Sequence, residues 1–128
     1  MSVSVMKVGT TAQIDPWKAD QVFSNRNRQK VIESLRARGP CDVSALGQQI
    51  EKTTGSKLDW YVIVYHLQYL QNLGIVDSKF QKGNPEPDHI VEYFWVVDEQ
   101  LSKYLEAWKA LVGDFATKVA PTQGIRRT

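Results

Sequence analysis

Few residues of this chain have the types and spacing that catalysis or metal binding needs. The 128 residues include one cysteine, Cys41, and two histidines, His66 and His89, which fall on different predicted elements. A metal site needs several ligands that converge, and a nucleophile needs an activating base. The sequence has no glycine-rich phosphate loop and no Gly-x-Ser-x-Gly motif. We therefore expect no enzymatic activity, no metal and no cofactor.

Basic side chains are the other candidates for chemistry, because they bind phosphates. The net charge is only +2, but the charges are unevenly distributed. Between Asn25 and Arg38 five basic residues stand against one acid, whereas between Asp77 and Glu99 six acids stand against two lysines. A local basic face of this kind fits a phosphate contact. The same charges could equally form a solvated helix face.

Length and composition predict one compact domain. A chain of 128 residues can bury a core without disulfides. Its single cysteine excludes an internal disulfide. That suits a reducing cytoplasm, where we expect the protein to be. No apolar stretch is long enough for a membrane span, and the first residues do not have the pattern of a signal peptide.

Apolar periodicity and capping residues predict three helices in the first part of the chain. An acid and a proline start the first helix. The short break at Gly55–Ser56, between the third helix and the segment that follows it, is what a helix-turn-helix requires. The residues that predict these boundaries are Asp15–Pro16 for the first helix, Ser24 or Asn25 and Gly39–Pro40 for the second, and Asp42 or Ser44 and Gly55–Ser56 for the third.

The segment Lys57–Leu73 has signals for both a strand and a helix. Its run Trp60–Tyr65 has the composition of a buried strand. Its apolar residues nevertheless recur at spacings of three and four, and Gly74 follows where a helix would end. We favour a helix held by tertiary packing. The residues of this helical stripe are Trp60, Ile63, Leu67, Leu70 and Leu73.

The rest of the chain predicts two strands and a final helix. Ile75–Gln81 and Ile90–Val97 form a hairpin around a turn-rich linker. Acids at Asp98–Glu99 start the last helix, and Pro121 closes it. The fold class is therefore mainly α with a small β hairpin: a winged helix-turn-helix with N- and C-terminal dimerisation helices. We expect a flexible N-terminal arm (1–14), the winged helix-turn-helix domain with flanking helices (15–120) and a flexible basic tail (121–128).

Three segments resemble the ArsR-type winged-helix transcriptional regulators. Phe23–Leu35 is similar to their first helices, Gly39–Leu46 to their turn into the helix-turn-helix, and His66–Val76 to the end of their recognition helix and the first wing strand. The resemblance covers about residues 17–115. It implies a homodimer that binds a palindromic operator and dimerises through its first and last helices. Many members of that family sense metals through paired cysteines or through His and Asp, a pattern that this chain lacks.

A DNA-binding role predicts contacts on the recognition helix, the hairpin and the start of the second helix. The recognition helix is poor in arginine and asparagine, which read guanine and adenine bidentately. We therefore expect modest base readout and more reliance on backbone contacts and DNA shape. Tyr61 and Tyr65 could instead pack against another surface, and the hairpin lysines could be solvated. The candidate contacts are Arg26, Arg28, Lys57, Tyr61, Val64, Tyr65, Gln68, Lys79 and Lys82.

The first and last helices both have apolar faces that a two-fold dimer could bury. The alternative is that the two helices pack against each other within a monomer. The candidate dimer residues are Trp17, Phe23, Leu101, Tyr104, Leu105, Trp108, Leu111 and Phe115.

The sequence thus predicts a homodimeric, cytoplasmic, DNA-binding transcriptional regulator whose partners are double-stranded DNA and a second copy of itself, with no membrane contact. The alternative is a winged-helix protein–protein interaction module in a larger nucleoprotein assembly. The apolar recognition helix and the acidic hairpin region motivate this second interpretation.

Overall fold

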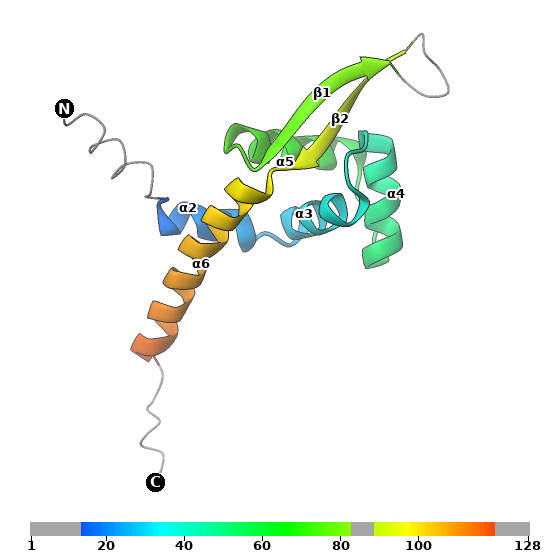
Figure 1. Cartoon of the computed structure of the whole chain (residues 1–128). Helices are drawn as coiled ribbons and strands as arrows, with labels where there is room; N and C mark the ends of the chain where they lie inside the picture. Colours follow the sequence, from blue (N-terminus) through cyan, green and yellow to red (C-terminus); the bar gives the residue numbers. More distant parts are fainter. Residues whose placement is uncertain (1–13, 83–88, 120–128) are drawn as a thin grey trace, which may run out of the picture. The chain divides into compact units, whose positions relative to one another are not determined.

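The computed structural model describes residues 14–82 and 89–119 of the chain, and Figure 1 shows its elements. Contacts between residues divide the chain into two units. Val22–Leu101 form one unit, and the described residues before and after it belong to a second. The predicted arm except Ile14, most of the hairpin linker, the predicted stop at Pro121 and the basic tail lie outside the described residues.

The helical residues of the second unit come from helix α2 (Pro16–Phe23) up to Gln21 and from helix α6 (Asp98–Val119) after Leu101. The predicted start of α2 is confirmed, because the Asp15 carboxylate accepts a hydrogen bond from the Trp17 backbone N–H at 3.0 Å. Two acids occupy the first turn of α6, also as predicted. Within this unit, the indole N–H of Trp108 donates to the Asp20 carboxylate at 3.1 Å, which joins α6 to α2.

In the larger unit, α3 (Arg26–Arg38) and α4 (Val43–Thr54) begin at side-chain caps. Asn25 accepts from the Arg28 backbone N–H at 2.9 Å, and Asp42 accepts from that of Ala45 at 2.8 Å. The caps therefore fall on one of the two residues predicted for each helix. Each cap satisfies a backbone N–H that has no partner inside its helix.

The segment that could have been a strand is helix α5 (Trp60–Asn72), as predicted. Ile63, Leu67 and Leu70 form its buried side. Trp60, the first member of the helical stripe, is 66% exposed. Trp60 is the first residue of the helix and lines hollows at the surface instead of the core.

Strands β1 (Val76–Lys82) and β2 (Ile90–Val96) form the predicted antiparallel hairpin. Val76 stands opposite Val96, and Lys82 stands opposite Ile90. An isolated bridge joins β2 to the segment before α4, since Cys41 and Phe94 exchange two backbone hydrogen bonds of 3.1 and 2.8 Å. The core of this unit lies among α3, α4, α5 and the base of the hairpin; its fully buried side chains include Val31, Leu35, Leu46, Ile50, Ile63, Leu67, Leu70, Ile75 and Val76.

Gly74 makes the sharp turn from α5 into β1. Its φ of +78° lies in the left-handed region, which side chains with a Cβ rarely adopt. We expect Gly74→Ala to lower the free energy of unfolding by about 1–2 kcal/mol, measured by urea titration. Gly47→Ala in the interior of α4 is the matched control. Its new Cβ would make an ordinary 3.5 Å contact with Ile63, so stability should rise by about 0.5–1 kcal/mol. Equal effects of the two substitutions would contradict this account.

Candidate nucleic-acid interface

Helix α5 buries one side and leaves the other side free. Tyr61 and Tyr65 are both more than half exposed, and Gln68 and Asn72 continue the same line along the helix at spacings of three and four. Side chains at these spacings lie on one face of a helix. The exposed face therefore offers two phenol hydroxyls and two amides, groups that can hydrogen-bond to phosphates or bases.

A buried arginine lies beneath this helix. Arg28, on α3, is only 6% exposed, and its guanidinium carbon lies 3.8 Å from the centre of the Tyr69 ring on α5. A cation over an aromatic face is attracted by the ring's quadrupole. Arg28 therefore links α3 to α5, and its burial removes it from the set of DNA contacts predicted from the sequence.

His66 packs into the same region, with 5% of its side chain exposed. Its ring meets that of Tyr65 edge to face, with centroids 5.1 Å apart. Its Nδ1 has no hydrogen-bond partner among the described residues. Burial lowers the pKa of His66, and the nearby positive charge of Arg28 lowers it further. The lowered pKa therefore favours the neutral imidazole at neutral pH.

The two hairpin lysines lie on opposite faces of the hairpin. Ser78 faces α5, because its hydroxyl accepts from the Gln71 side-chain amide at 2.9 Å and donates to Glu92 at 2.6 Å. Side chains alternate along a strand. Lys82 therefore shares the face of Ser78, while Lys79 lies on the other face of the sheet.

The other basic candidates are spread over several elements. Lys57 is exposed in the turn between α4 and α5, and Arg26 is exposed at the start of α3. Arg36, farther along α3, pairs with Asp98 at 3.1 Å; both side chains are well exposed, so this pair adds little stability. Of the predicted set, the structure brings together Tyr61, Val64, Tyr65 and Gln68 on α5, with Lys57 in the turn before it.

The sequence-based interpretation missed a groove beside the exposed face of α5. Trp60 and Val64 line one wall, and the segment entering α4 and strand β2 line the others. Its volume is about 540 Å³. The sequence did not indicate that Trp60 is exposed, because Trp60 falls at the same helical spacing as the buried residues Ile63, Leu67 and Leu70.

Cys41 has the properties of a structural residue. It is buried, and burial raises the pKa of its thiol to about 11. A thiol in that state forms little of the reactive thiolate at neutral pH. In the part of the chain that the structure describes, no group of three or more His, Cys, Asp or Glu side chains could hold a metal ion. None of the described helices is long and apolar enough to cross a membrane.

The predicted dimer residues fall into three groups. Phe23, Leu101 and Tyr104 are buried within the single chain, so they offer little surface to a second copy. Trp17 is 66% exposed and Phe115 is 63% exposed. The partly exposed members are Leu105, Trp108 and Leu111.

Solved structures with a similar fold are known. A PadR family transcriptional regulator from Eggerthella lenta matches with 20% identity and a TM-score of 0.51, over 77% of this chain and 86% of that one. Diamide-treated YodB from Bacillus subtilis matches with 16% identity and a TM-score of 0.52, over 80% and 90%. No protein-family profile matches the chain, and no curated protein sequence does.

These likenesses confirm the predicted winged helix-turn-helix fold, mainly α with a small β hairpin. Dimerisation through the first and last helices stays a prediction. In that fold α4 and α5 are the helix-turn-helix, and β1 and β2 are the wing. The likeness extends to winged-helix regulators in general and does not single out the ArsR-type proteins that the sequence resembles.

The neutral state of His66 predicts a pH-dependent stability. Because its pKa is lower in the folded chain than in the unfolded chain, the unfolded state takes up a proton first as the pH falls below about 6.5. The free energy of unfolding should therefore fall as the pH drops below that value. The contribution of His66 to this fall ends once the pH is below its lowered pKa in the folded chain. Urea titrations at pH 7.5 and 5.5 measure the loss.

Substituting His66→Gln should remove this part of the loss, whereas His89→Gln, at an exposed position on the hairpin, should retain it. The same loss in His66→Gln as in the parent would show that other groups cause the pH dependence.

Proposed function

We propose that this protein is a cytoplasmic, homodimeric transcriptional regulator that binds double-stranded DNA through α5 and the hairpin wing. The observation that carries the proposal is the one-sided burial of α5. The second helix of its helix-turn-helix leaves Tyr61, Tyr65 and Gln68 exposed. In helix-turn-helix proteins the second helix is the one that enters the major groove.

The chemistry of this surface favours backbone and shape recognition over base reading. Its groups are hydroxyls and amides, and its nearest basic side chain along the chain is Lys57, just before the helix. No arginine stands on α5, so the strongest contact to guanine is missing. Lys57 and the wing lysines Lys79 and Lys82 would instead contact phosphates, which fix position more than sequence. The Eggerthella lenta structure of the same fold is a transcriptional regulator by name, which supports this role.

The dimer would form through the second unit. There Trp17, Leu111, Val112 and Phe115, with Asp20, line a hollow of about 260 Å³, and three of the four apolar side chains are well exposed. A two-fold axis would place this patch against its own copy and bury both. Two copies of the helix-turn-helix would then present two α5 helices to a duplex.

DNA binding should depend on Lys57 and Gln68. We expect a duplex of about 30 base pairs to bind with an affinity that falls steeply between about 50 and 200 mM salt. Lys57→Ala should reduce the slope of log affinity against log salt by about 1 per protomer, because one phosphate contact is lost. Gln68→Ala should weaken binding by about 1–3 kcal/mol if its amide reads a base.

Fluorescence anisotropy with a selected duplex measures both effects. Lys103→Ala, an exposed lysine of α6, is the control and should bind as the parent does. Unchanged affinity and salt slope in the Lys57→Ala/Gln68→Ala double variant would remove α5 from the contact surface.

Dimerisation should depend on Phe115. Substituting Phe115→Glu places a charge in the apolar patch, so sedimentation should show a dimer for the parent and a monomer for the variant. Ile90→Glu is the matched control, because Ile90 is equally exposed but stands on β2. A parent chain that sediments as a monomer at all concentrations would contradict the dimer.

A further inference from the structure

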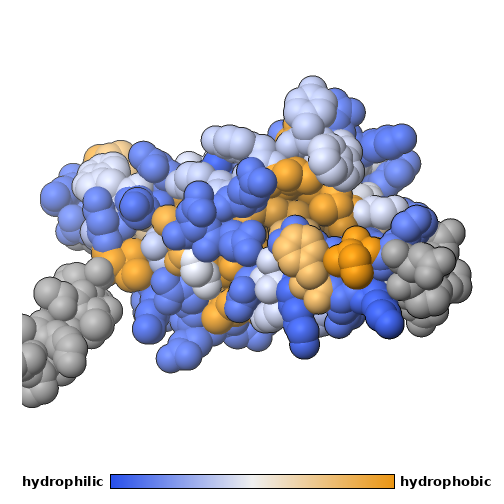
Figure 2. Space-filling model, turned by 90° about the horizontal axis from the view of Figure 1, so that it is seen from above, coloured by the Kyte–Doolittle hydropathy of each residue, from blue (hydrophilic) through white to orange (hydrophobic). Residues whose placement is uncertain are grey.

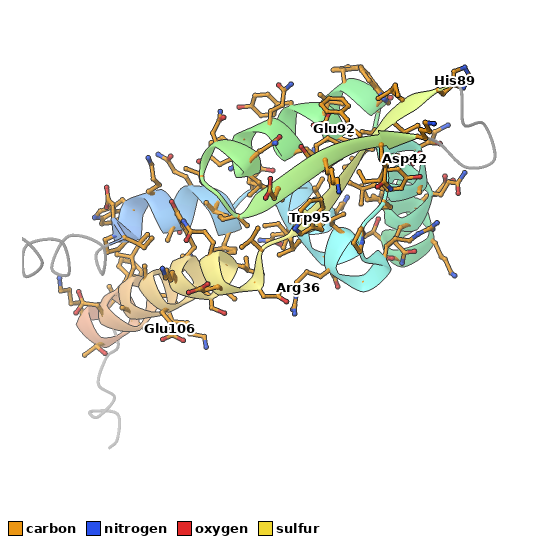
Figure 3. All side chains as sticks on the ribbon, turned by 45° about the horizontal axis from the view of Figure 1, so that its top comes forward. Arg36, Asp42, His89, Glu92, Trp95 and Glu106 are labelled. Carbon is orange, nitrogen blue, oxygen red and sulfur yellow. The ribbon has the colours of Figure 1, made fainter. Side chains whose placement is uncertain are left out.

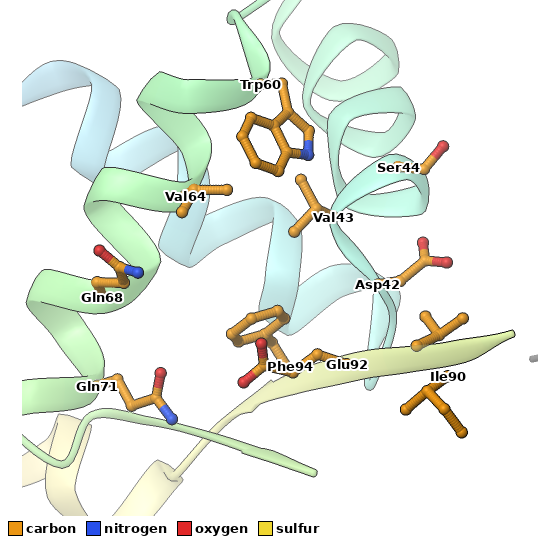
Figure 4. Close-up of a pocket in the computed structure, with 11 residues that line it drawn as sticks. Asp42, Val43, Ser44, Trp60, Val64, Gln68, Gln71, Ile90, Glu92 and Phe94 are labelled. Carbon is orange, nitrogen blue, oxygen red and sulfur yellow. The ribbon is translucent and has the colours of Figure 1, made fainter. Parts of the chain in front are cut away.

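The groove between α4, α5 and β2 has walls that do not suit a phosphate backbone. Figure 4 shows Trp60 and Val64 of α5 facing Val43, with Phe94 and Glu92 of β2 beneath them. Figure 2 shows hydrophobic residues gathered in a hollow on one face of the molecule. The lining residues are Asp42, Val43, Ser44, Trp60, Val64, Gln68, Gln71, Ile90, Val91, Glu92 and Phe94.

The charge of this groove is negative only. Among the described residues that line it, two are acids, Asp42 and Glu92, and none is Lys, Arg or His. Asp42 lies on the segment that enters α4, and Glu92 lies on the hairpin (Figure 3). Lys82 stands opposite Ile90 on the same sheet face, but it is not among the lining residues. A nucleic-acid phosphate would be repelled here, whereas a cation would be attracted.

Strand β2 also offers unpaired backbone to the groove. The sheet has two strands, so β1 covers one edge of β2. On the other edge, Cys41 pairs with Phe94 and is the only described residue in a bridge there. Backbone groups that point to one side recur at every second residue of an antiparallel strand. The N–H and C=O groups of Ile90 and Glu92 therefore point to the same side as those of Phe94, along the groove.

We propose that this groove binds an extended segment of a partner protein, in which a bulky apolar side chain stands beside a lysine or arginine. The segment adds to β2 along Ile90–Glu92. Its apolar side chain enters between Trp60, Val64 and Phe94, and its cation meets Glu92. Strand addition to an exposed edge is a common mode of peptide recognition, in which the backbone supplies affinity and side-chain pockets supply specificity.

An extended segment fits better than a compact ligand. Two large apolar side chains at the rim, Trp60 and Ile90, are both about two-thirds exposed, so the apolar surface extends beyond the hollow itself. A peptide can cover the hollow, the rim and the strand edge together. The proposal does not rest on DNA binding, since the walls and the charge of the groove do not involve the exposed tyrosines.

The experiment is a selection of phage-displayed random peptides on the immobilised full-length chain. The expected result is enrichment of sequences with a bulky apolar residue beside Lys or Arg. Recovery of no sequences, or of acidic ones, would overturn the proposal.

A synthetic peptide of a selected sequence is then used to locate the site. Its affinity for the parent chain and for variants is measured by calorimetry. Trp60→Ala and Glu92→Lys should each weaken binding by at least about tenfold. Their controls, Val119→Ala and Glu106→Lys, change a similarly exposed apolar residue and an exposed acid of α6, and should bind as the parent does. Equal losses in variants and controls would overturn the assignment of the groove.

A charge swap separates direct contact from misfolding. A peptide whose cation is replaced by glutamate should bind Glu92→Lys more tightly than it binds the parent, a gain that an unfolded chain cannot give. No gain would place the cation elsewhere and overturn the contact.

The chain itself carries Ile125 beside Arg126 and Arg127, so its own C-terminal residues are another possible occupant. If Arg126→Glu/Arg127→Glu binds the selected peptide at least about tenfold more tightly than the parent does, this segment competes for the groove and the partner proposal is overturned. Equal affinity supports an external partner.

Discussion

The packing of α5 against α3 and the hairpin is the constraint on which the rest of the structure depends. Its β-branched and aromatic residues have low intrinsic helix propensity, so the helix persists because Ile63, Leu67 and Leu70 are buried. The contact of Arg28 with Tyr69 lies at the same interface. The proposed DNA-contact surface and the peptide groove are both built on this helix. Any change that loosens its buried side therefore alters both of them.

Local signals in the sequence were sufficient for the elements and for several of their ends. Asn25 and Asp42 cap their helices because a short polar side chain can reach the backbone two or three residues ahead. Gly74 ends the turn after α5 because glycine tolerates a positive φ. Such signals involve residues close in sequence and need no knowledge of the packing. The order of helices and strands, and with it the fold class, followed from them.

Side-chain roles that depend on neighbouring elements could not be predicted in this way. Arg28 is charged, yet it lies buried against Tyr69, and Trp60 is apolar and in phase with the core, yet it is exposed. Periodicity identifies one side of a helix but does not show how far its neighbours cover it. Likewise, Lys79 and Lys82 lie on opposite faces of the hairpin because of a register that only strand pairing sets.

The two sides of the exposed surface of α5 differ in chemistry, and this difference bears on function. Tyr61 and Tyr65 stand on a side whose hydroxyl and amide groups can hydrogen-bond to phosphate. Val64 instead faces a groove whose two acids repel phosphate. Gln68 lies at the boundary, since it is exposed along the line of the tyrosines and also lines the groove. A duplex on α5 and a peptide in the groove would therefore compete for Gln68. A winged helix with this arrangement can couple DNA occupancy to a protein partner without any change of conformation, because the two ligands share one side chain.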